Sequence, residues 1–547
     1  MGGLRWLRLS CLIIAVGVAA MISTHAVHTQ GASCYISLPE GDLQGAHVGG
    51  ACAFLGVPFA ASTAGSLRWK PPQPAPAWTP SVFNATTGTA MCPQINNSGQ
   101  LVGSEDCLKL NVWTSHIRPT MLAPVIVWFH TGGFGQTSAN FAASNGRRMA
   151  EETGALVVAA NYRLGAFGFL AHAALAAEDP AYSSSGNYGV LDQRAALEWV
   201  RDHIAAFGGN PANVTIAGTS AGSLSVSLHL VSPASEGLFD RAIMQSGFAS
   251  YRWRSSEEAQ EQGRAFAAAI GCADPSQVVT CMRGQSRDVV LRALPVGQDQ
   301  VVETRRVQWG PVVDGREIPE QPRILYEAGV FSRVPVIIGT NSDEGWPFVD
   351  RSFPTGLTAQ QYETTVSTEF GGDAAAVLGM YPVADFASPK EALARLIGDV
   401  EYVCEARRTA RAIERTKTRV YRYSFDYEVP AVAQNHVIHG LESNLVFGNN
   451  FGAPSNYALG AVDDAFFRAV AGYWTRFAAT GNPNVDDDSV THWPAMRTPT
   501  GNGRGADKHL VLEAIPHEGL RLRERECDFW EPYYLRSTTG VVPASQP

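Results

Sequence analysis

The sequence predicts an α/β protein whose core is a large, mostly parallel sheet with helices on both faces. Apolar runs such as Val125–Phe129 and Val334–Ile338 have the composition of strands that are buried on both faces. The β-branched run Val214–Ile216 precedes a helical-looking stretch, Ser223–Leu230. The 547 residues contain neither an evident flexible linker nor a repeat of about 20 to 50 residues, so we expect one large domain.

The N-terminus has the features of a secretion signal. Arg5 and Arg8 precede an apolar run over residues 9–22, and Thr24-His25-Ala26 offers small residues at the positions that a signal peptidase reads. The run is shorter than the roughly 20 apolar residues of a membrane-spanning helix, although an uncleaved anchor is the alternative. We therefore expect a signal peptide over residues 1–26, a mature domain over residues 27–547, and a secreted protein, extracellular or periplasmic, that is not membrane-bound after cleavage.

Charge and cysteine content suit an exported enzyme. The formal charge of −9 becomes two units more negative without the signal segment, which carries two arginines and no acid. An acidic chain without basic clusters is a poor match for nucleic acid or an anionic membrane surface, so we expect neither as a partner. Of nine cysteines, eight lie outside the signal segment, and none has zinc-like spacing to histidines. Disulfides are therefore expected, and no metal site.

The first functional motif follows the apolar run over residues 125–129. The chain continues as His130-Thr131-Gly132-Gly133. Such glycines can be mere turn residues, but glycine also lets the main chain approach a substrate closely. In some enzymes with a parallel sheet, a loop at this place directs backbone N–H groups at the negative charge that develops on a substrate oxygen during catalysis.

The second motif is Gly218-Thr219-Ser220-Ala221-Gly222, which lies between the β-branched run and the helical stretch. Glycines two residues before and two after a serine let the chain turn so sharply that the hydroxyl stands clear of the backbone. A bare G-x-S-x-G also arises by chance in a chain with 53 glycines. The motif alone therefore leaves a nucleophile elbow and a chance match about equally open.

An acid and a histidine follow the serine along the chain, and this order favours a nucleophile elbow over a chance match. The apolar run ending at Ile338 breaks into a polar loop with Asp343 and Glu344, and the later stretch "NHVIHGLE" carries His436 and His439. Each of these residues alone is more often a surface or structural residue. In the order serine, acid, histidine, each after a strand, they match the triad of the α/β-hydrolase fold.

Several longer motifs resemble the type-B carboxylesterase and cholinesterase family over roughly residues 48–533. "SEDCLKLNVW" and "FGGNPANVTIAGTSAG" are the most specific, and "FLGVPFA", "LRWKPPQP", "NYRLGAFGFL", "NYGVLDQRAALEWV", "MQSG", "PVVDG", "GTNSDEG" and "FAATGNPN" accompany them. The resemblance implies an α/β-hydrolase fold in one large domain, with loop and helical insertions that form an active-site gorge. It implies a serine hydrolase that cleaves carboxylic esters of small molecules without a cofactor or metal.

The resemblance also assigns roles to individual residues. It implies Ser220 as the nucleophile, His439 as the base and Glu344 as the acid that orients the base, with Asp343 and His436 as neighbours without those roles. The N–H groups of Gly132, Gly133 and Ala221 would form the oxyanion hole, and Ser246 would support Glu344. Thr131 replaces the first glycine of the family's usual triple-glycine loop, which puts the fine geometry of that loop in doubt.

Three disulfides are implied by the resemblance, and a fourth is our own interpretation. The resemblance pairs Cys92 with Cys107, Cys272 with Cys281, and Cys404 with Cys527. Cys34 and Cys52 remain, and they flank "GDLQG", a plausible turn of an early hairpin. We therefore expect a Cys34–Cys52 bridge.

Three departures from the cholinesterases bear on the substrate. Those enzymes favour cations with a tryptophan in the loop of the first disulfide and a glutamate before the nucleophile, whereas the loop 92–107 has no tryptophan and Thr219 precedes Ser220. Arg305 and Arg306 stand where cholinesterases have acyl-pocket aromatics, and they are either solvated or bind a carboxylate. The neighbouring pocket candidates are Trp309, Trp346 and Phe348.

We expect, on these grounds, an ester with an anionic acyl group. A named possibility is resemblance to bacterial type-B esterases that release tricarballylate from long-chain fumonisin toxins. The alternatives are a general carboxylesterase for neutral esters, a serine peptidase, and an adhesion or binding module on the same fold. Neither the oligomeric state nor glycosylation at the sequons of Asn84, Asn96 and Asn213 follows from the sequence.

Overall fold

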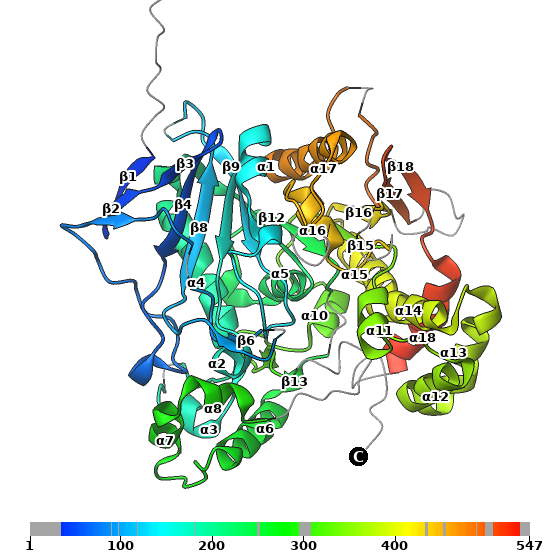
Figure 1. Cartoon of the computed structure of the whole chain (residues 1–547), viewed down its shortest axis with the longest axis horizontal. Coiled ribbons are helices and arrows are strands. Elements are labelled where there is room, and N and C mark those ends of the chain that lie inside the picture. Colours follow the sequence, from blue (N-terminus) through cyan, green and yellow to red (C-terminus); the bar gives the residue numbers. More distant parts are fainter. Residues whose placement is uncertain are drawn as a thin grey trace, which may run out of the picture. The chain divides into compact units, whose positions relative to one another are not determined.

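The computed structural model describes residues 34–294 and 308–536, apart from positions 89, 97, 118, 181, 249–251, 431, 433–435, 452–455, 488–489 and 498–506. The predicted signal segment, Arg305 and Arg306 lie outside the described residues. The chain from Cys34 onward forms one compact unit (Figure 1). No helix of the described part has the length and hydropathy needed to cross a membrane.

An eleven-stranded sheet runs through this unit. Its strands are β3 (Ala46–Val48), β4 (Ala51–Pro58), β8 (Lys109–Thr114), β9 (Ala123–Phe129), β10 (Leu156–Ala160), β11 (Gly209–Thr219), β12 (Arg241–Gln245), β15 (Val336–Asn341), β16 (Val420–Phe425), β17 (Lys508–Leu512) and β18 (His517–Leu520). They lie in the order β18-β17-β16-β15-β12-β11-β9-β10-β8-β4-β3. The pairs from β17 to β10 are parallel, and those at both edges are antiparallel.

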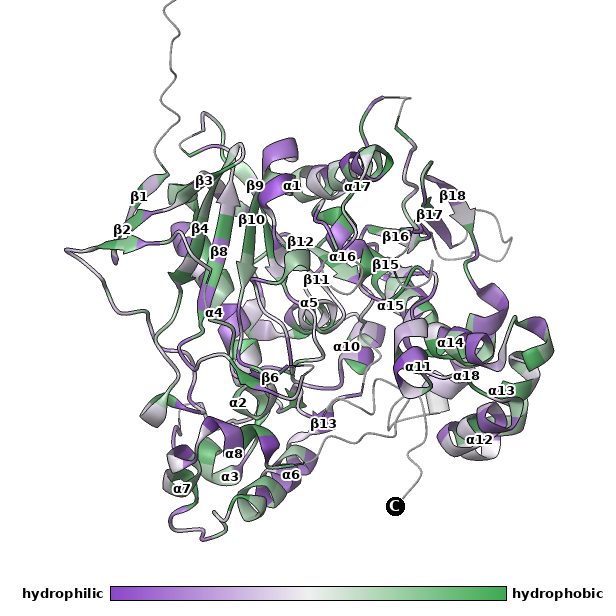
Figure 2. Ribbon diagram, in the orientation of Figure 1, coloured by the Kyte–Doolittle hydropathy of each residue, from purple (hydrophilic) through white to green (hydrophobic). Residues whose placement is uncertain are grey.

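The central strands are apolar along their whole length because both faces of the sheet are covered. In β9, Val125, Val127 and Phe129 belong to one hydrophobic core, whereas Ile126 and Trp128 belong to the other. Figure 2 shows mostly hydrophobic strands at the centre of the sheet and helices of mixed character. The first core is covered by α4 (Tyr188–His203), α5 (Ala221–Val231) and α15 (Cys404–Arg415), and the second by α1 (Arg147–Thr153), α16 (Leu441–Val446) and α17 (Ala461–Thr480).

This arrangement confirms the predicted fold class of a mostly parallel sheet between helices. Two groups of inserted helices have small cores of their own. One group packs around Trp69 and comprises α2 (Gly165–Phe169), α3 (Ala173–Ala176), α6 (Ser256–Ala269), α7 (Val278–Gly284) and α8 (Arg287–Arg292). The other packs around Trp530 and comprises α11 (Trp346–Ser352), α12 (Ala359–Phe370), α13 (Ala374–Met380), α14 (Pro389–Gly398), the π-helical turn η7 (Asp399–Val403) and α18 (Glu524–Arg536).

Short elements and disulfides complete the described structure. The described residues also form three small sheets: β1 (Tyr35–Leu38) with β2 (Gly41–Gln44) and β5 (Val82–Asn84), β6 (Gln94–Ile95) with β7 (Leu101–Val102), and β13 (Arg254–Ser255) with β14 (Val312–Val313). The helix α10 (Pro322–Ala328) precedes β15. Disulfides join Cys34 with Cys52, Cys92 with Cys107, Cys272 with Cys281, and Cys404 with Cys527. The last one ties α15 to α18, so it links the helices under the sheet to the inserted group.

Candidate active site

Ser220 occupies a strained turn between β11 and α5. Its φ of 55° and ψ of −121° lie in a region that residues with a side chain seldom adopt, at a cost of about 1–3 kcal/mol. The neighbouring strand and the helix hold this conformation: the Ser220 N–H donates to the Gln245 carbonyl at 2.9 Å, and the Ser220 carbonyl accepts from the Leu224 N–H at 2.9 Å. The turn therefore has the geometry of a nucleophile elbow.

The two flanking glycines are required because the elbow packs directly against the end of β9. A Cβ atom on Gly222 would lie 2.0 Å from the Phe129 carbonyl oxygen, and one on Gly218 would lie 2.5 Å from the Gly222 carbonyl carbon. Both neighbours are backbone atoms, which cannot rotate away. The spacing of glycines in the motif is thus explained by close packing on both sides of Ser220.

Glu344 lies in the loop after β15 and is buried, with 1% of its surface exposed. Its Oε1 accepts from the Ser246 hydroxyl at 2.5 Å and from the Asn341 N–H at 2.8 Å. Its Oε2 lies 2.6 Å from Nδ1 of His439. A carboxylate held by these two donors is well placed to orient the histidine.

His439 is carried by a loop that is joined to the loop of Glu344. The Asp343 N–H donates to the Val437 carbonyl at 3.1 Å, and the Asp343 carboxylate accepts from the Val437 N–H at 3.0 Å. The aromatic rings of Phe348 and Tyr402 lie 5.2 Å and 4.8 Å from the His439 ring. The imidazole is therefore fixed on one edge by a carboxylate and bordered by aromatic walls.

The two candidate histidines have different surroundings. His436 stacks on Trp346 at 3.8 Å, and its ring nitrogens lie 3.6 Å from Asp343 and 3.5 Å from Glu391. Only His439 of the two contacts Glu344 in the described structure. The structure thus brings together Glu344, His439 and Ser246, and it keeps Asp343 and His436 beside them.

The loop after β9 turns tightly over the beginning of α5. Gly132 has a φ of 111° and Gly133 a φ of 58°, and the Gly132 carbonyl accepts from the N–H groups of Gly135 and Gln136 at 3.0 Å each. Thr131, which replaces a glycine of the family pattern, does not have a positive φ, and its carbonyl accepts from the Thr137 hydroxyl at 2.5 Å. The turn needs glycine at position 132, where a Cβ would lie 2.3 Å from the Gln136 carbonyl oxygen, and it accepts threonine at position 131.

The side chain of His130 is uncharged and holds this loop in place. Burial lowers its pKa to about 4. Its Nδ1 lies 2.9 Å from the Thr137 hydroxyl, its ring stacks on Tyr162 at 4.3 Å, and the Tyr162 hydroxyl donates to its carbonyl at 2.8 Å. These contacts hold the end of β9 rigid where the glycines begin.

The remaining pocket candidates are distributed differently. Phe348 contacts the His439 ring, whereas Trp346 contacts His436. Trp309 packs edge-on against Phe266 of α6 at 5.7 Å, within the core around Trp69. Of the three aromatic candidates, therefore, Phe348 is the one in ring contact with the histidine that faces Glu344.

A second buried carboxylate, Glu442, was missed by the sequence analysis. Its Oε1 accepts from the Thr219 hydroxyl at 2.5 Å and the Gln245 amide at 3.0 Å, and its Oε2 accepts from the Asn341 amide at 2.6 Å. Burial raises its pKa, and the nearby charge of Glu344 adds to this effect. The available signal was its position three residues after His439, at the beginning of α16, since an acid there is directed back toward the same loop.

Comparison with known proteins agrees with this geometry. Residues 32–530 match the model of the carboxylesterase family. The chain is 32% identical over 538 residues to a cholinesterase of Mus musculus, a match that covers 90% of this chain and 85% of the relative. The chain therefore belongs to the carboxylesterase family, and the protein is a carboxylic ester hydrolase with a serine nucleophile.

Proposed function

We propose that Ser220, His439 and Glu344 form the catalytic triad of this esterase. The observation that carries the proposal is the 2.6 Å contact between His439 Nδ1 and Glu344 Oε2, and the strained backbone turn at Ser220 supports it. A histidine that donates its Nδ1 proton to a carboxylate keeps a lone pair on Nε2. That nitrogen takes the Ser220 proton while the Ser220 oxygen bonds to the ester carbonyl carbon.

The N–H groups of Gly132, Gly133 and Ala221 hold the negative charge that develops on the carbonyl oxygen. Removal of one such donor in related mechanisms costs about 3 kcal/mol of transition-state stabilisation. The positive φ values at Gly132 and Gly133 support this role, because such tight glycine turns are the backbone shapes that bind anions through N–H groups. Ser246 supports Glu344 through its 2.5 Å hydrogen bond.

The reaction then proceeds in two balanced halves. In the first half, His439 returns its proton to the leaving alcohol as the bond from the carbonyl carbon to the alcohol oxygen breaks, and an acyl-enzyme ester remains on Ser220. In the second, His439 removes a proton from water, the water oxygen bonds to the acyl carbon, and Ser220 leaves with the proton. The products are one alcohol and one carboxylic acid.

Within this class, we propose a preference for esters whose acid part keeps a free carboxylate. The loop 92–107 has no tryptophan, and the residue before Ser220 is Thr219, whose hydroxyl is engaged with Glu442. Neither position offers the groups that favour cations in cholinesterases. Arg305 and Arg306 would supply a planar, bidentate contact to the anion, and tricarballylate esters of fumonisin-like molecules have this chemistry.

The test compares kcat/KM for a half-ester of a tricarboxylic acid with kcat/KM for its fully methylated, neutral analogue. We expect the wild type to favour the anionic ester, and Arg305→Ala or Arg306→Ala to narrow the ratio at least about tenfold, or ~1.4 kcal/mol. Arg201→Ala is the matched control, because Arg201 is exposed and pairs with Asp202 on α4. A wild-type preference for the neutral ester would identify a general carboxylesterase instead.

We also propose that residues 1–26 direct export and that the mature chain starts near Val27. The four disulfides support this proposal, because such bonds persist in oxidising compartments. Mass spectrometry of the N-terminus after expression in a secreting host tests the cleavage site. Retention of Arg5 and Arg8 in the purified protein would identify an uncleaved anchor.

A further inference from the structure

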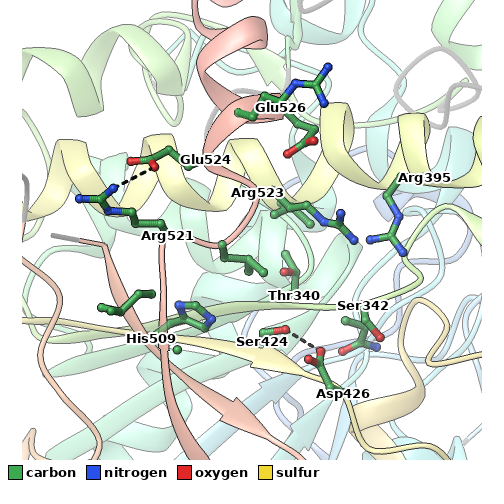
Figure 3. A pocket seen from close by; sticks show the side chains of 16 residues that line it. Thr340, Ser342, Arg395, Ser424, Asp426, His509, Arg521, Arg523, Glu524 and Glu526 are labelled. Carbon is green, nitrogen blue, oxygen red and sulfur yellow. Dashed lines mark hydrogen bonds and ion pairs between the residues drawn. The ribbon is translucent and has the colours of Figure 1, made fainter. Parts of the chain in front are cut away.

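A polar cavity lies next to the loops of Glu344 and His439, and neither Ser220 nor His439 lines it. It has a volume of about 610 Å³ and opens between the end of β15, α14, and the segment that connects β18 to α18 (Figure 3). Its size falls within the range of small-molecule sites. Asn341 lines it, and the same residue contacts Glu344, Ile438 and Glu442, so the cavity borders the back of the catalytic loops.

Two arginines from different elements converge in this cavity. Arg395 comes from α14 and Arg523 from the segment before α18, and Figure 3 shows their guanidinium groups directed toward one another. Each approaches its paired carboxylate only to 3.7 Å, Arg395 at Asp343 and Arg523 at Asp399. These separations exceed a hydrogen bond. The two positively charged guanidinium groups therefore face the same part of the cavity. An anion between them would accept hydrogen bonds from their N–H groups and reduce their mutual repulsion.

A third arginine is buried behind the wall of this cavity. Arg422 of β16 has no exposed surface, and its Nη2 donates to the carbonyl of Val403, a lining residue, at 3.3 Å. Its Nε and Nη1 have no hydrogen-bond partner in the described structure. Ser424, two residues along the same strand and on the same face, lines the cavity. A buried cation with unsatisfied donors requires a compensating charge nearby.

The surrounding groups supply that charge only in part. Asp507 faces Arg422, but its carboxylate is hydrogen-bonded to Arg411. Arg407 and Arg411 are also close, and together with burial their charges lower the pKa of Arg422 to about 10. His509 of β17 also lines the cavity. Burial and the charge of Arg422 lower its pKa to about 4, so the imidazole is neutral at pH 7. The inner end of the cavity is therefore positive.

The carboxylates that line the cavity do not cancel its positive charge. Glu524 is turned toward Arg521 at 3.4 Å, as Figure 3 shows. Asp426 accepts from the Ser424 hydroxyl at 2.6 Å, and its pKa is raised by burial and by the charges of Glu513 and Asp343. Glu526 is the third acid of the lining, which also contains Arg395, Arg523 and Arg525. Asp343 and Asp399 lie outside the lining, each 3.7 Å from one of the two converging arginines.

We propose that this cavity is an anion-binding site, distinct from the site of ester cleavage, that takes a multivalent oxyanion between Arg395 and Arg523 with the charge of Arg422 behind it. Inorganic phosphate and a polycarboxylate share the required chemistry, since both present several oxygens to planar guanidinium forks. The site does not depend on the substrate preference proposed above, because that preference rests on Arg305 and Arg306.

Isothermal titration calorimetry of the full chain at constant ionic strength tests the proposal, with phosphate, citrate and chloride as separate titrants. We expect saturable one-to-one binding of phosphate, citrate or both, and none of chloride. Arg395→Gln and Arg523→Gln should each weaken binding at least tenfold. Arg521→Gln is the matched control: it also lines the cavity, but its guanidinium pairs with Glu524, so affinity should stay within twofold.

The two informative variants should fold, because the Arg395 and Arg523 side chains are 25% and 34% exposed, and near-UV circular dichroism verifies this. Absence of saturable binding by both phosphate and citrate up to 10 mM would overturn the proposal. So would equal weakening by Arg521→Gln, which would indicate general charge screening. Loss of binding in an Arg305→Ala/Arg306→Ala variant, with retention in Arg523→Gln, would move the anion to the substrate pocket and also overturn it.

Discussion

At the scale of single residues, two buried carboxylates, Glu344 and Glu442, lie close to the turn at Ser220. Asn341 contacts both, with its N–H donating to Glu344 at 2.8 Å and its side-chain amide donating to Glu442 at 2.6 Å. Two negative charges in one buried region are tolerated only if hydrogen-bond donors satisfy both. Thr219 is such a donor, and it immediately precedes Ser220. Thr219, the residue before the proposed nucleophile, is therefore an anchor for Glu442.

Thr219→Val is expected to destabilise the fold, because it removes a donor to a buried carboxylate while it preserves the shape of the side chain. A hydrogen bond to a charged group contributes about 1.5–3 kcal/mol, so the free energy of unfolding should fall by about that amount. Urea denaturation measures the change. Thr219→Ser, which keeps the hydroxyl, is the control, and a larger loss in Thr219→Ser than in Thr219→Val would contradict the explanation.

The two histidines of "NHVIHGLE" should behave differently in catalysis. His439→Ala removes the group that contacts Glu344, so we expect kcat to fall by at least about 10³-fold, in line with triads of this kind. His436→Ala removes a ring that stacks on Trp346, so kcat should change by less than about tenfold. Steady-state kinetics on a simple ester separates them. The reverse ranking would assign the base to His436.

At the scale of elements, the active site depends on how closely α5 approaches β9. The first turn of the helix begins at Ala221, and Gly222 lies over the Phe129 carbonyl at the end of the strand. Helix propensity alone would favour alanine at this position by about 1 kcal/mol. The close approach overrides that preference, because the strand end and the helix start must meet for the elbow to form.

Gly222→Ala should therefore destabilise the protein even though alanine is the better helix former. The new Cβ would lie 2.0 Å from a backbone oxygen, so β9 and α5 must separate, and we expect a loss of more than about 2 kcal/mol in the free energy of unfolding, together with most activity. Gly284→Ala at the end of α7 is the control, because a Cβ there meets nothing within 4 Å. Equal effects of the two substitutions on thermal unfolding would refute the packing argument.

At the scale of the whole molecule, buried ionisable groups make stability depend on pH in two opposing ways. Burial raises the pKa of Asp399 to about 7 and that of Glu405 to about 8. At pH values between the ordinary pKa of each carboxyl group and its raised pKa, the folded protein therefore binds more protons than the unfolded chain. Their contribution to stability is lost as the pH rises through that window. The buried histidines His130, His229 and His509 have lowered pKa values, so they oppose this trend only below about pH 6.5.

Between pH 7 and pH 8, therefore, the free energy of unfolding should decrease, with Glu405 as the main cause, because the histidines are then neutral in both states. Glu405→Gln should flatten this slope. Glu363→Gln on the exposed side of α12 is the control and should leave the slope unchanged. Chemical denaturation at closely spaced pH values gives the result, and a stability that rises from pH 7 to pH 8 in the wild type would contradict the assignment.

The sequence by itself determined the architecture and the order of the reactive groups. Continuous apolar runs predicted the strands that became β9, β11 and β15, because a parallel strand buried on both faces leaves no room for polar positions. Glycine spacing predicted the turns around Gly132 and Ser220, because backbone conformation and close approach are local properties. The resemblance to a family then added which acid and which histidine to choose.

Only the tertiary structure decided the contacts between distant segments. Glu442 receives hydrogen bonds from residues 223, 197 and 101 positions away, and none of these partners is marked by a local pattern. Trp309 packs on Phe266, and Arg395 and Arg523 converge although they lie on α14 and before α18. A local pattern records which face of an element is buried, but the identity of the opposing side chain follows from how the strands and inserted helices assemble in space.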